Sequence, residues 1–481
     1  MQVFTSYAGS SDQFQKPFTD YLTELQKRGM TTNEIGLALE ARFPFTHRLQ
    51  TAGTTLKMLP AKFSPGEWVS LQAFKLKVYD IQKKELVPSN NFTSFSNSNF
   101  NELRRAYLSL EMVILEQGSS EAIQASAINF ADQYNIAYAS LADKPYRQAQ
   151  GKALTYPSST RLQAETLYYR LPLIEITLMT YALALILMLA NRRHSKLGRM
   201  TWLVLLSGFA VHTTVLILRC YILERPPVSN MFETVVYVPW IAVALGLSFY
   251  SATRSRLTIA AAVVASFALL VLLRLTQVDS RLENVQAVLD SQYWLIIHVL
   301  MIVASYGAFA VCGILGHFYL IEYALSKRNS PSPANSLEVQ DRLAKIARFT
   351  LHTMYVGVAL LIPGTILGGV WAAESWGRFW DWDPKESWAF ISACVYLLVI
   401  HAYTFHHILD FGLAIGSITG LIAISFTWYG VNYVLGTGLH SYGFGSGGEF
   451  YYYMYVAVEC LIIFLMVLLK SNTTNSLKKI E

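Results

Sequence analysis

The sequence is poor in charged residues. Asp, Glu, Lys and Arg make up only 15% of its 481 residues, whereas hydrophobic types make up 53%. Soluble domains usually contain about a quarter charged residues. The shortage falls in residues 171–470, while residues 1–170 have an ordinary polar composition. This distribution argues against a cytosolic enzyme.

Cysteine is also scarce. The four cysteines are Cys220, Cys312, Cys394 and Cys460, and no two of them have the CxxC spacing of a zinc or redox site. All lie inside or at the edge of apolar runs, which predicts buried thiols that serve packing. The residues from Met1 onward lack a basic stretch followed by an apolar run, so we expect no signal peptide.

Long apolar runs are what the sequence has in abundance. Each is near 20 residues, the length that a helix needs to cross a hydrocarbon layer about 30 Å thick. The predicted spans are 171–190, 200–220, 233–250, 257–275, 293–320, 350–370, 387–407, 413–434 and 450–470. They predict an all-α polytopic membrane protein with about nine transmembrane helices, in a membrane domain of residues 169–481.

Residues 1–168 form a separate front domain in this interpretation. Apolar and polar residues recur at helical spacing over 101–116 and 121–138, which predicts a mostly helical domain. It contains no catalytic motif that we can find, so we interpret it as a docking or support domain.

Lysine and arginine are distributed unevenly between the loops on the two sides. One set of loops, with the C-terminal tail, holds Arg192, Arg193, Lys196, Arg199, Arg254, Arg256, Lys327, Arg328, Arg342, Lys345, Arg348, Lys470, Lys478 and Lys479. The opposite set holds only Arg219, Arg225, Arg274, Arg281, Arg378 and Lys385. Basic loops stay in the cytoplasm, so we expect a cytoplasmic C-terminus and an exported front domain. Export without a signal peptide predicts a longer polypeptide, fused or split, whose earlier spans carry the front domain across.

The loop between the sixth and seventh predicted spans, 371–388, is unusually rich in tryptophan. It contains five: Trp371, Trp376, Trp380, Trp382 and Trp388. Aromatic belts at membrane surfaces explain isolated tryptophans, but a belt requires neither this density nor the adjacent Asp-Pro-Lys-Glu sequence that begins at Asp383. Flat aromatic faces beside fixed charges suit a large planar ligand with a polar edge.

Four segments resemble one known family. The pattern WGxxWxWDPKExW resembles the WWD signature of haem-handling proteins. Residues 226–233 (PPVSNMFE) resemble the PxSNxYE segment of the CcsA (ResC) membrane subunit of the System II cytochrome c synthase, with Phe in place of Tyr. Residues 293–299 and 436–443 resemble its two external histidine segments. The resemblance covers about 200–445, and the front domain resembles, more weakly, the end of a fused CcsB/ResB partner.

Two histidines lie in these external segments, on the side of the tryptophan loop. Haem iron takes axial ligands from opposite faces, and neutral imidazole is a common one. His298, near the outer end of the fifth span, and His440, between the last two spans, are therefore the predicted ligands of an external haem.

A second pair of histidines lies inside the predicted spans, where ionisable residues are functional candidates by default. The resemblance implies that His401 ligates an internal haem. His212 is a weaker partner, because helix rise places the two about 9 Å apart in depth. In the fused family the partner portion supplies the missing internal histidine.

The resemblance implies a function in cytochrome c maturation. Haem b would cross the membrane, be presented at the tryptophan site and be attached through thioethers to the CxxCH motif of apocytochrome c. The implied setting is the bacterial inner membrane. The implied partners are a CcsB/ResB-type subunit, apocytochrome c, thiol-reducing proteins and membrane lipid, with no nucleic acid. Two alternatives remain open: a haem transporter or chaperone that serves a separate ligase, and a b-type electron carrier.

Overall fold

The computed structural model describes most of the chain. The described residues are 93–116, 118–142, 145–149, 152–155, 157–190, 195–276, 282, 291–329, 333–436 and 449–477, with short pieces between 27 and 88. The chain divides into two compact units, residues 1–163 and 164–481. Each unit is described separately below.

The first unit contains a helical pair, α5 (Asn97–Leu115) and α6 (Ser120–Ala139), as predicted. Ser96 and Ser119 cap the two helices by accepting hydrogen bonds from backbone N–H groups in the first turns. Phe74, Phe100 and Tyr107 pack as tilted rings in the core of this unit. The unit is therefore held by a small aromatic core.

Three small antiparallel sheets accompany these helices, and the sequence analysis missed them. They pair β1 (Lys57–Pro60) with β2 (Trp68–Ser70), β3 (Lys77–Asp80) with β4 (Glu85–Pro88), and β5 (Pro145–Ala149) with β6 (Lys152–Thr155). Strands of three to five residues are too short for a clear alternation of apolar and polar side chains.

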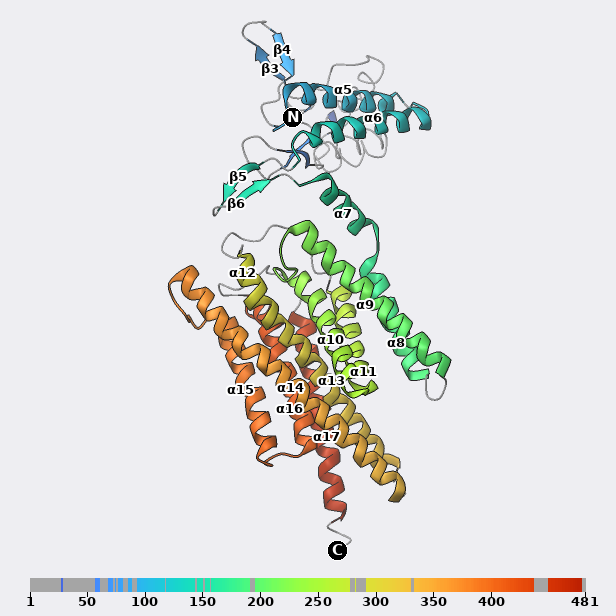
Figure 1. Cartoon of the computed structure of the whole chain (residues 1–481), viewed down its shortest axis with the longest axis vertical. Helices are drawn as coiled ribbons and strands as arrows, with labels where there is room; N and C mark the ends of the chain where they lie inside the picture. The colour runs from blue at the N-terminus through green and yellow to red at the C-terminus, as the bar shows by residue number, and fades with distance from the viewer. Residues whose placement is uncertain are drawn as a thin grey trace. The chain divides into compact units, whose positions relative to one another are not determined.

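The second unit is an all-helical bundle (Figure 1). Its elements are the larger part of α7 (Ser159–Arg170), which begins before residue 164, and α8 (Leu173–Ala190), α9 (Ser195–Leu223), α10 (Met231–Thr253), α11 (Arg256–Leu275), α12 (Gln292–Trp294), η3 (Leu295–Val299), α13 (Leu300–Asn329), α14 (Pro333–Trp376), α15 (Pro384–Thr404), α16 (Asp410–Ser425), η4 (Phe426–Leu435) and α17 (Glu449–Leu477). Within the described residues, nine helices are long and apolar enough to span a membrane, which confirms the predicted number.

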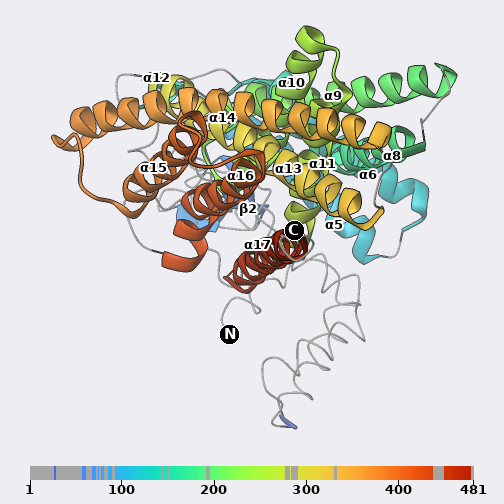
Figure 2. The ribbon, with the colours of Figure 1, turned by 90° about the horizontal axis from the view of Figure 1, so that it is seen from below.

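Helix α13 is central to this bundle, and α17 is peripheral. Helix α13 packs against α10, α11, α14 and α16, and Gly316 lets its backbone approach α16 closely, because a Cβ there would lie 2.8 Å from the Ala414 carbonyl oxygen. Helix α17 lies at the edge of the bundle (Figure 2), and only 11% of its apolar stretch is buried among the described residues. A hydrogen bond of 2.9 Å between His317 Nε2 and Glu459 Oε2 ties α17 to α13.

The prediction of four buried cysteines is confirmed for Cys312 and wrong for Cys394 and Cys460, whereas Cys220 is half-buried. Cys312 is buried and its thiol donates to the Thr350 carbonyl oxygen, but Cys394 and Cys460 are exposed on the surface of the bundle. Sequence position inside an apolar run does not distinguish the face of a membrane helix that packs on neighbours from the face that contacts lipid. Both faces are apolar.

Candidate functional site

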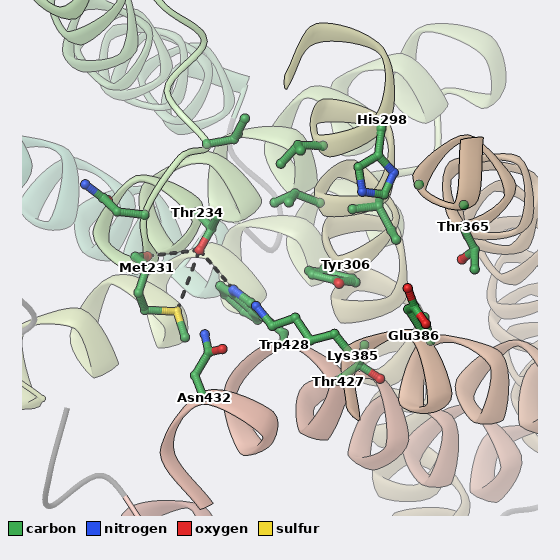
Figure 3. Close-up of a pocket in the computed structure, with 18 of the residues that line it drawn as sticks. Met231, Thr234, His298, Tyr306, Thr365, Lys385, Glu386, Thr427, Trp428 and Asn432 are labelled. Atoms are coloured by element: carbon green, nitrogen blue, oxygen red, sulfur yellow. Dashed lines mark hydrogen bonds between the residues drawn. The ribbon is translucent and has the colours of Figure 1, made fainter. Parts of the chain in front are cut away.

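A pocket opens at the end of the bundle where α10 and α15 begin and α14 ends. We call this the tryptophan end. The cavity itself has a volume of about 100 Å³, and with its open mouth the space amounts to about 830 Å³. Figure 3 labels ten of its lining residues: Met231, Thr234, His298, Tyr306, Thr365, Lys385, Glu386, Thr427, Trp428 and Asn432. They come from five helical segments that are distant in the sequence.

His298 lies on the wall of this pocket with a defined ring orientation. Its Nδ1 is 2.7 Å from the Gly364 carbonyl oxygen, which can only accept. Nδ1 therefore carries the proton in the neutral ring, and Nε2 carries the lone pair that a metal would use. This arrangement is the one that metal-ligating histidines generally have.

Two local features of the backbone place this ring. His298 lies in the π-helical turn η3, a rare conformation that occurs frequently at functional sites. On the facing helix, residue 368 is glycine, and a Cβ there would lie 2.6 Å from His298 Cε1. The imidazole thus occupies space that any larger residue at 368 would fill.

The five tryptophans that were predicted to form one platform lie in different environments. Trp371 is buried, stacks on Trp294 at 6.5 Å and meets the His298 ring edge to face at 5.8 Å. Trp294 in turn donates from Nε1 to Glu374 Oε2 at 2.8 Å. Trp371 therefore supports His298 and is not among the pocket-lining residues.

Of the remaining tryptophans in 371–388, only Trp380 lines the pocket. Trp388 packs on Phe426 of η4, with ring centroids 4.1 Å apart. Trp376 ends α14 and is half-buried, whereas Trp382 is 71% exposed in a left-handed backbone conformation. The five side chains do not form one continuous surface.

The charged residues on either side of Trp382 are largely engaged in local contacts at the start of α15. Asp383 caps α15 by accepting from the Lys385 N–H, Glu386 completes a capping box, and Pro384 takes the first helical position. Arg378 pairs with Asp381 at 2.6 Å. Lys385 points into the pocket (Figure 3).

Two polar atoms in the pocket wall are buried and make no hydrogen bond within the described part of the chain. They are Nε1 of Trp380, a donor, and Oδ1 of Asn432, an acceptor. Orphaned buried polar atoms are rare and call for an explanation. A ligand with a polar edge would satisfy them.

His440 lies outside the described residues. The described chain before it is η4, a second π-helical segment, which ends at Gly436 in a left-handed conformation. In the sequence, His440 follows shortly after an element that lines the pocket through Thr427, Trp428 and Asn432.

The two internal histidines have different surroundings. His212 is buried, and both of its ring nitrogens are engaged, Nδ1 with Tyr181 Oη at 3.1 Å and Nε2 with the Val236 carbonyl oxygen at 2.9 Å. His401 is exposed on α15, with Nδ1 2.6 Å from the Leu397 carbonyl oxygen. Measured from the tryptophan end, His401 is about 26 Å deep and His212 about 17 Å. The structure does not bring them together.

Sequence reasoning missed Trp428, Tyr306 and the two π-helical segments. The ring of Trp428 packs on Tyr306 at 5.8 Å in the pocket wall. A tryptophan or tyrosine inside an apolar run has no distinguishing signal. Asn432 had one, because an amide inside a predicted span needs a hydrogen-bond partner.

These features define a polytopic helical membrane protein with an open, mostly apolar pocket at one end of the bundle. Residues 228–440 match the family model described as cytochrome C assembly protein. The chain is 30% identical over 276 residues to the cytochrome c biogenesis protein CcsA of Synechococcus sp. (strain CC9605), an alignment that covers 52% of this chain and 88% of that protein. It is 28% identical over 274 residues to CcsA of Buxus microphylla, covering 50% and 84%.

A longer relative is Protein NrfI of Wolinella succinogenes, to which the chain is 32% identical over 306 residues. That alignment covers 60% of this chain and 32% of NrfI, so the chain matches about a third of that relative's length. The chain belongs to the CcsA family of cytochrome c assembly proteins. Its function lies in cytochrome c biogenesis, and the family implies that it handles haem.

Proposed function

We propose that this protein moves haem b across the membrane, holds it in the pocket at the tryptophan end and presents it to apocytochrome c. The observation that most supports this role is His298, which lies on the pocket wall and whose Nδ1–H donates to the Gly364 carbonyl oxygen, so that the lone pair is on Nε2. Haem is the substrate, and its planar ring with polar carboxylates fits a wall of aromatic rings and orphaned polar atoms.

His298 ligates the iron on one face in this proposal, and His440 on the other. Trp428 and Trp380 contact the ring, and the Trp380 N–H donates to a haem carboxylate. Lys385, which points into the pocket, supplies positive charge for the same groups (Figure 3). Trp376 and Trp382 form the rim that apocytochrome c approaches, and Asp383 fixes that rim by capping α15.

The protein's part in the reaction is to position and ligate. Each of the two thiols of CxxCH adds across a haem vinyl group, so that a C–S bond forms and the thiol hydrogen ends on the vinyl carbon. Nothing leaves, and no protein nucleophile is required. The histidine of CxxCH then displaces one histidine of the protein, which releases the product. Holding the reacting groups in register contributes most of the acceleration.

A partner subunit completes the internal site in this account. His401 points away from the bundle on the exposed face of α15, in line with Cys394 and Leu398. An exposed imidazole on a membrane helix is costly without a partner. We propose that a histidine of a CcsB/ResB-type subunit provides the second ligand, and that residues 1–168 are part of such a subunit. His212, already hydrogen-bonded at both nitrogens, has a packing role.

The same proposal fixes the orientation. The distribution of lysine and arginine supports a tryptophan end outside the cytoplasm and a C-terminus inside. A bacterial inner membrane is the proposed setting. The reductants that keep the CxxCH thiols reduced then act on the outer side. An electron carrier would instead need paired histidines at matched depth, and His212 and His401 differ by about 9 Å.

Two neighbouring tryptophans test the pocket directly. We expect Trp380→Ala to lower the haem retained per protein about tenfold, because the ring lines the pocket and its loss removes an aromatic contact worth about 1 kcal/mol or more together with a hydrogen bond. Trp382→Ala, at an exposed position in the same loop, is the matched control and is expected to retain haem. The measurement is haem content after purification. Equal losses in both variants would contradict the assignment of Trp380.

Reconstitution separates a synthase from a chaperone. We expect the chain, expressed with a CcsB/ResB-type subunit in a bacterial host that lacks its own maturation proteins, to produce a cytochrome c with covalent haem. The measurement is haem staining of the denatured cytochrome, with a CxxCH→AxxAH client as the control. Haem bound by the complex but never attached would favour the chaperone.

A further inference from the structure

A fully buried ion pair lies beneath the pocket without lining it. Arg219 of α9 and Glu233 of α10 both have fully buried side chains, and their atoms are 2.9 Å apart. Arg219 also donates to Tyr168 Oη at 3.0 Å, and its guanidinium lies 4.8 Å from the centre of the Phe232 ring. Buried charges are costly even when paired, so ordinary packing between α9 and α10 does not explain them.

The second carboxylate oxygen of Glu233 organises the turn before α10. Oε2 accepts from the backbone N–H of Ser229 at 2.8 Å and from its hydroxyl at 2.7 Å. The Arg225 guanidinium lies 3.9 Å from Oε1. One carboxylate thus fastens residues 225–229 to the first turn of α10, where Asn230 caps the helix by accepting from the Glu233 N–H at 2.9 Å.

This turn and the start of α10, residues 228–234, form one wall of the pocket. Val228, Asn230, Met231 and Thr234 all line it. Thr234 Oγ1 also accepts a hydrogen bond of 3.0 Å from Trp428 Nε1, which connects this wall to η4 (Figure 3). A shift of Glu233 therefore displaces both the start of α10 and the Trp428 ring.

We infer that the Arg219–Glu233 pair is a positioning device that fixes the 228–234 wall and Trp428 for the bound haem. The inference rests on the proposed haem-binding function. Neither residue lines the pocket, so both act through the groups that they hold. The Glu233 carboxylate binds two partners at once. It holds the turn before α10 through Ser229 and holds α9 through Arg219, which an apolar side chain at position 233 could not do.

The experiment compares removal of the carboxylate with removal of the whole pair. The full chain is purified with its partner subunit as wild type, Glu233→Gln, and the double variant Arg219→Met with Glu233→Met. Haem content, the absorption spectrum and the thermal midpoint are measured for each. The control is Glu175→Gln, which breaks the exposed Glu175–Arg274 pair between α8 and α11.

We expect haem content to fall about tenfold in both Glu233 variants, in line with the losses that small displacements of a site produce, with a shifted spectrum for the residual haem. The double variant is decisive, because replacing a buried ion pair by apolar residues often preserves stability. A stable double variant with wild-type haem content and spectrum would reduce the pair to a packing element. If the double variant is unstable, Ser229→Ala provides the test instead, because this substitution removes one hydrogen bond to Glu233 and no charge. A wild-type haem spectrum from Ser229→Ala would overturn the inference. Wild type without haem would instead contradict the proposed function.

Discussion

Replacement of His298 by alanine is expected to lower cytochrome c maturation by more than about 100-fold. Loss of a hydrogen-bond partner behind a metal-ligating histidine already costs about 10- to 100-fold in metal affinity, and this variant removes the proposed ligand itself. The ring occupies a defined place between Gly368 and Trp371. Its removal leaves a space that free imidazole fits, so added imidazole is expected to restore part of the activity.

The control for this prediction is His352→Ala. His352 lies on α14, where its side chain is exposed and its Nδ1 contacts the Arg348 carbonyl oxygen of the preceding turn. Maturation by this variant is expected to equal wild type. The readout for both variants is the yield of covalently attached haem on a co-expressed cytochrome. A wild-type yield from His298→Ala would contradict the proposal that His298 ligates the haem iron.

The substitution Gly368→Ala, which adds a single methyl group, is also expected to lower the maturation yield strongly. Gly368→Ala places a Cβ 2.6 Å from His298 Cε1, far closer than real contacts allow. Either the imidazole rotates away from the Gly364 carbonyl oxygen, or α14 moves away from η3. Both displace the ligand, and misplacement by about 1 Å can cost about 10²-fold in rate. We expect a fall of 10- to 100-fold in maturation yield.

Gly369→Ala is the matched variant for this test. The atoms nearest to its Cβ would be those at the end of the Phe379 ring, the closest at 2.7 Å, and Phe379 is half-exposed in the loop, where its ring can turn away. We therefore expect an effect several times smaller, although the substitution is the same and the residues are adjacent. Equal effects of the two variants would show that the contact with His298 is not what matters at this position.

The number and positions of the spans could be predicted from the sequence because the membrane imposes a simple rule on length and hydropathy. All nine predicted spans correspond to helices in the described residues. The largest difference is α14, which begins at Pro333 and extends well before its predicted span of 350–370. Hydropathy detects the part of a helix inside the lipid, whereas the helix itself continues as long as its backbone hydrogen bonds do.

The site was accessible only in outline. The residue types that line the pocket could be anticipated in part from the motif at 371–388, but the different positions of its tryptophans could not. Trp371 contacts His298, whereas Trp380 lines the pocket. This difference depends on where α14 ends and α15 begins. The position of Trp428 depends on contacts between distant segments, such as its hydrogen bond with Thr234, which is 194 residues away in the sequence. The sequence contains no local signal for such contacts.

The central claim is that iron is bound at the tryptophan end through His298. The most direct test is the absorption spectrum of the reduced protein, purified with its partner subunit, as wild type and as His298→Ala. The account predicts six-coordinate, low-spin haem in the wild type, and a lost or five-coordinate spectrum in the variant that shifts back when imidazole is added. Identical spectra from the two proteins, or a wild type without haem, would contradict it.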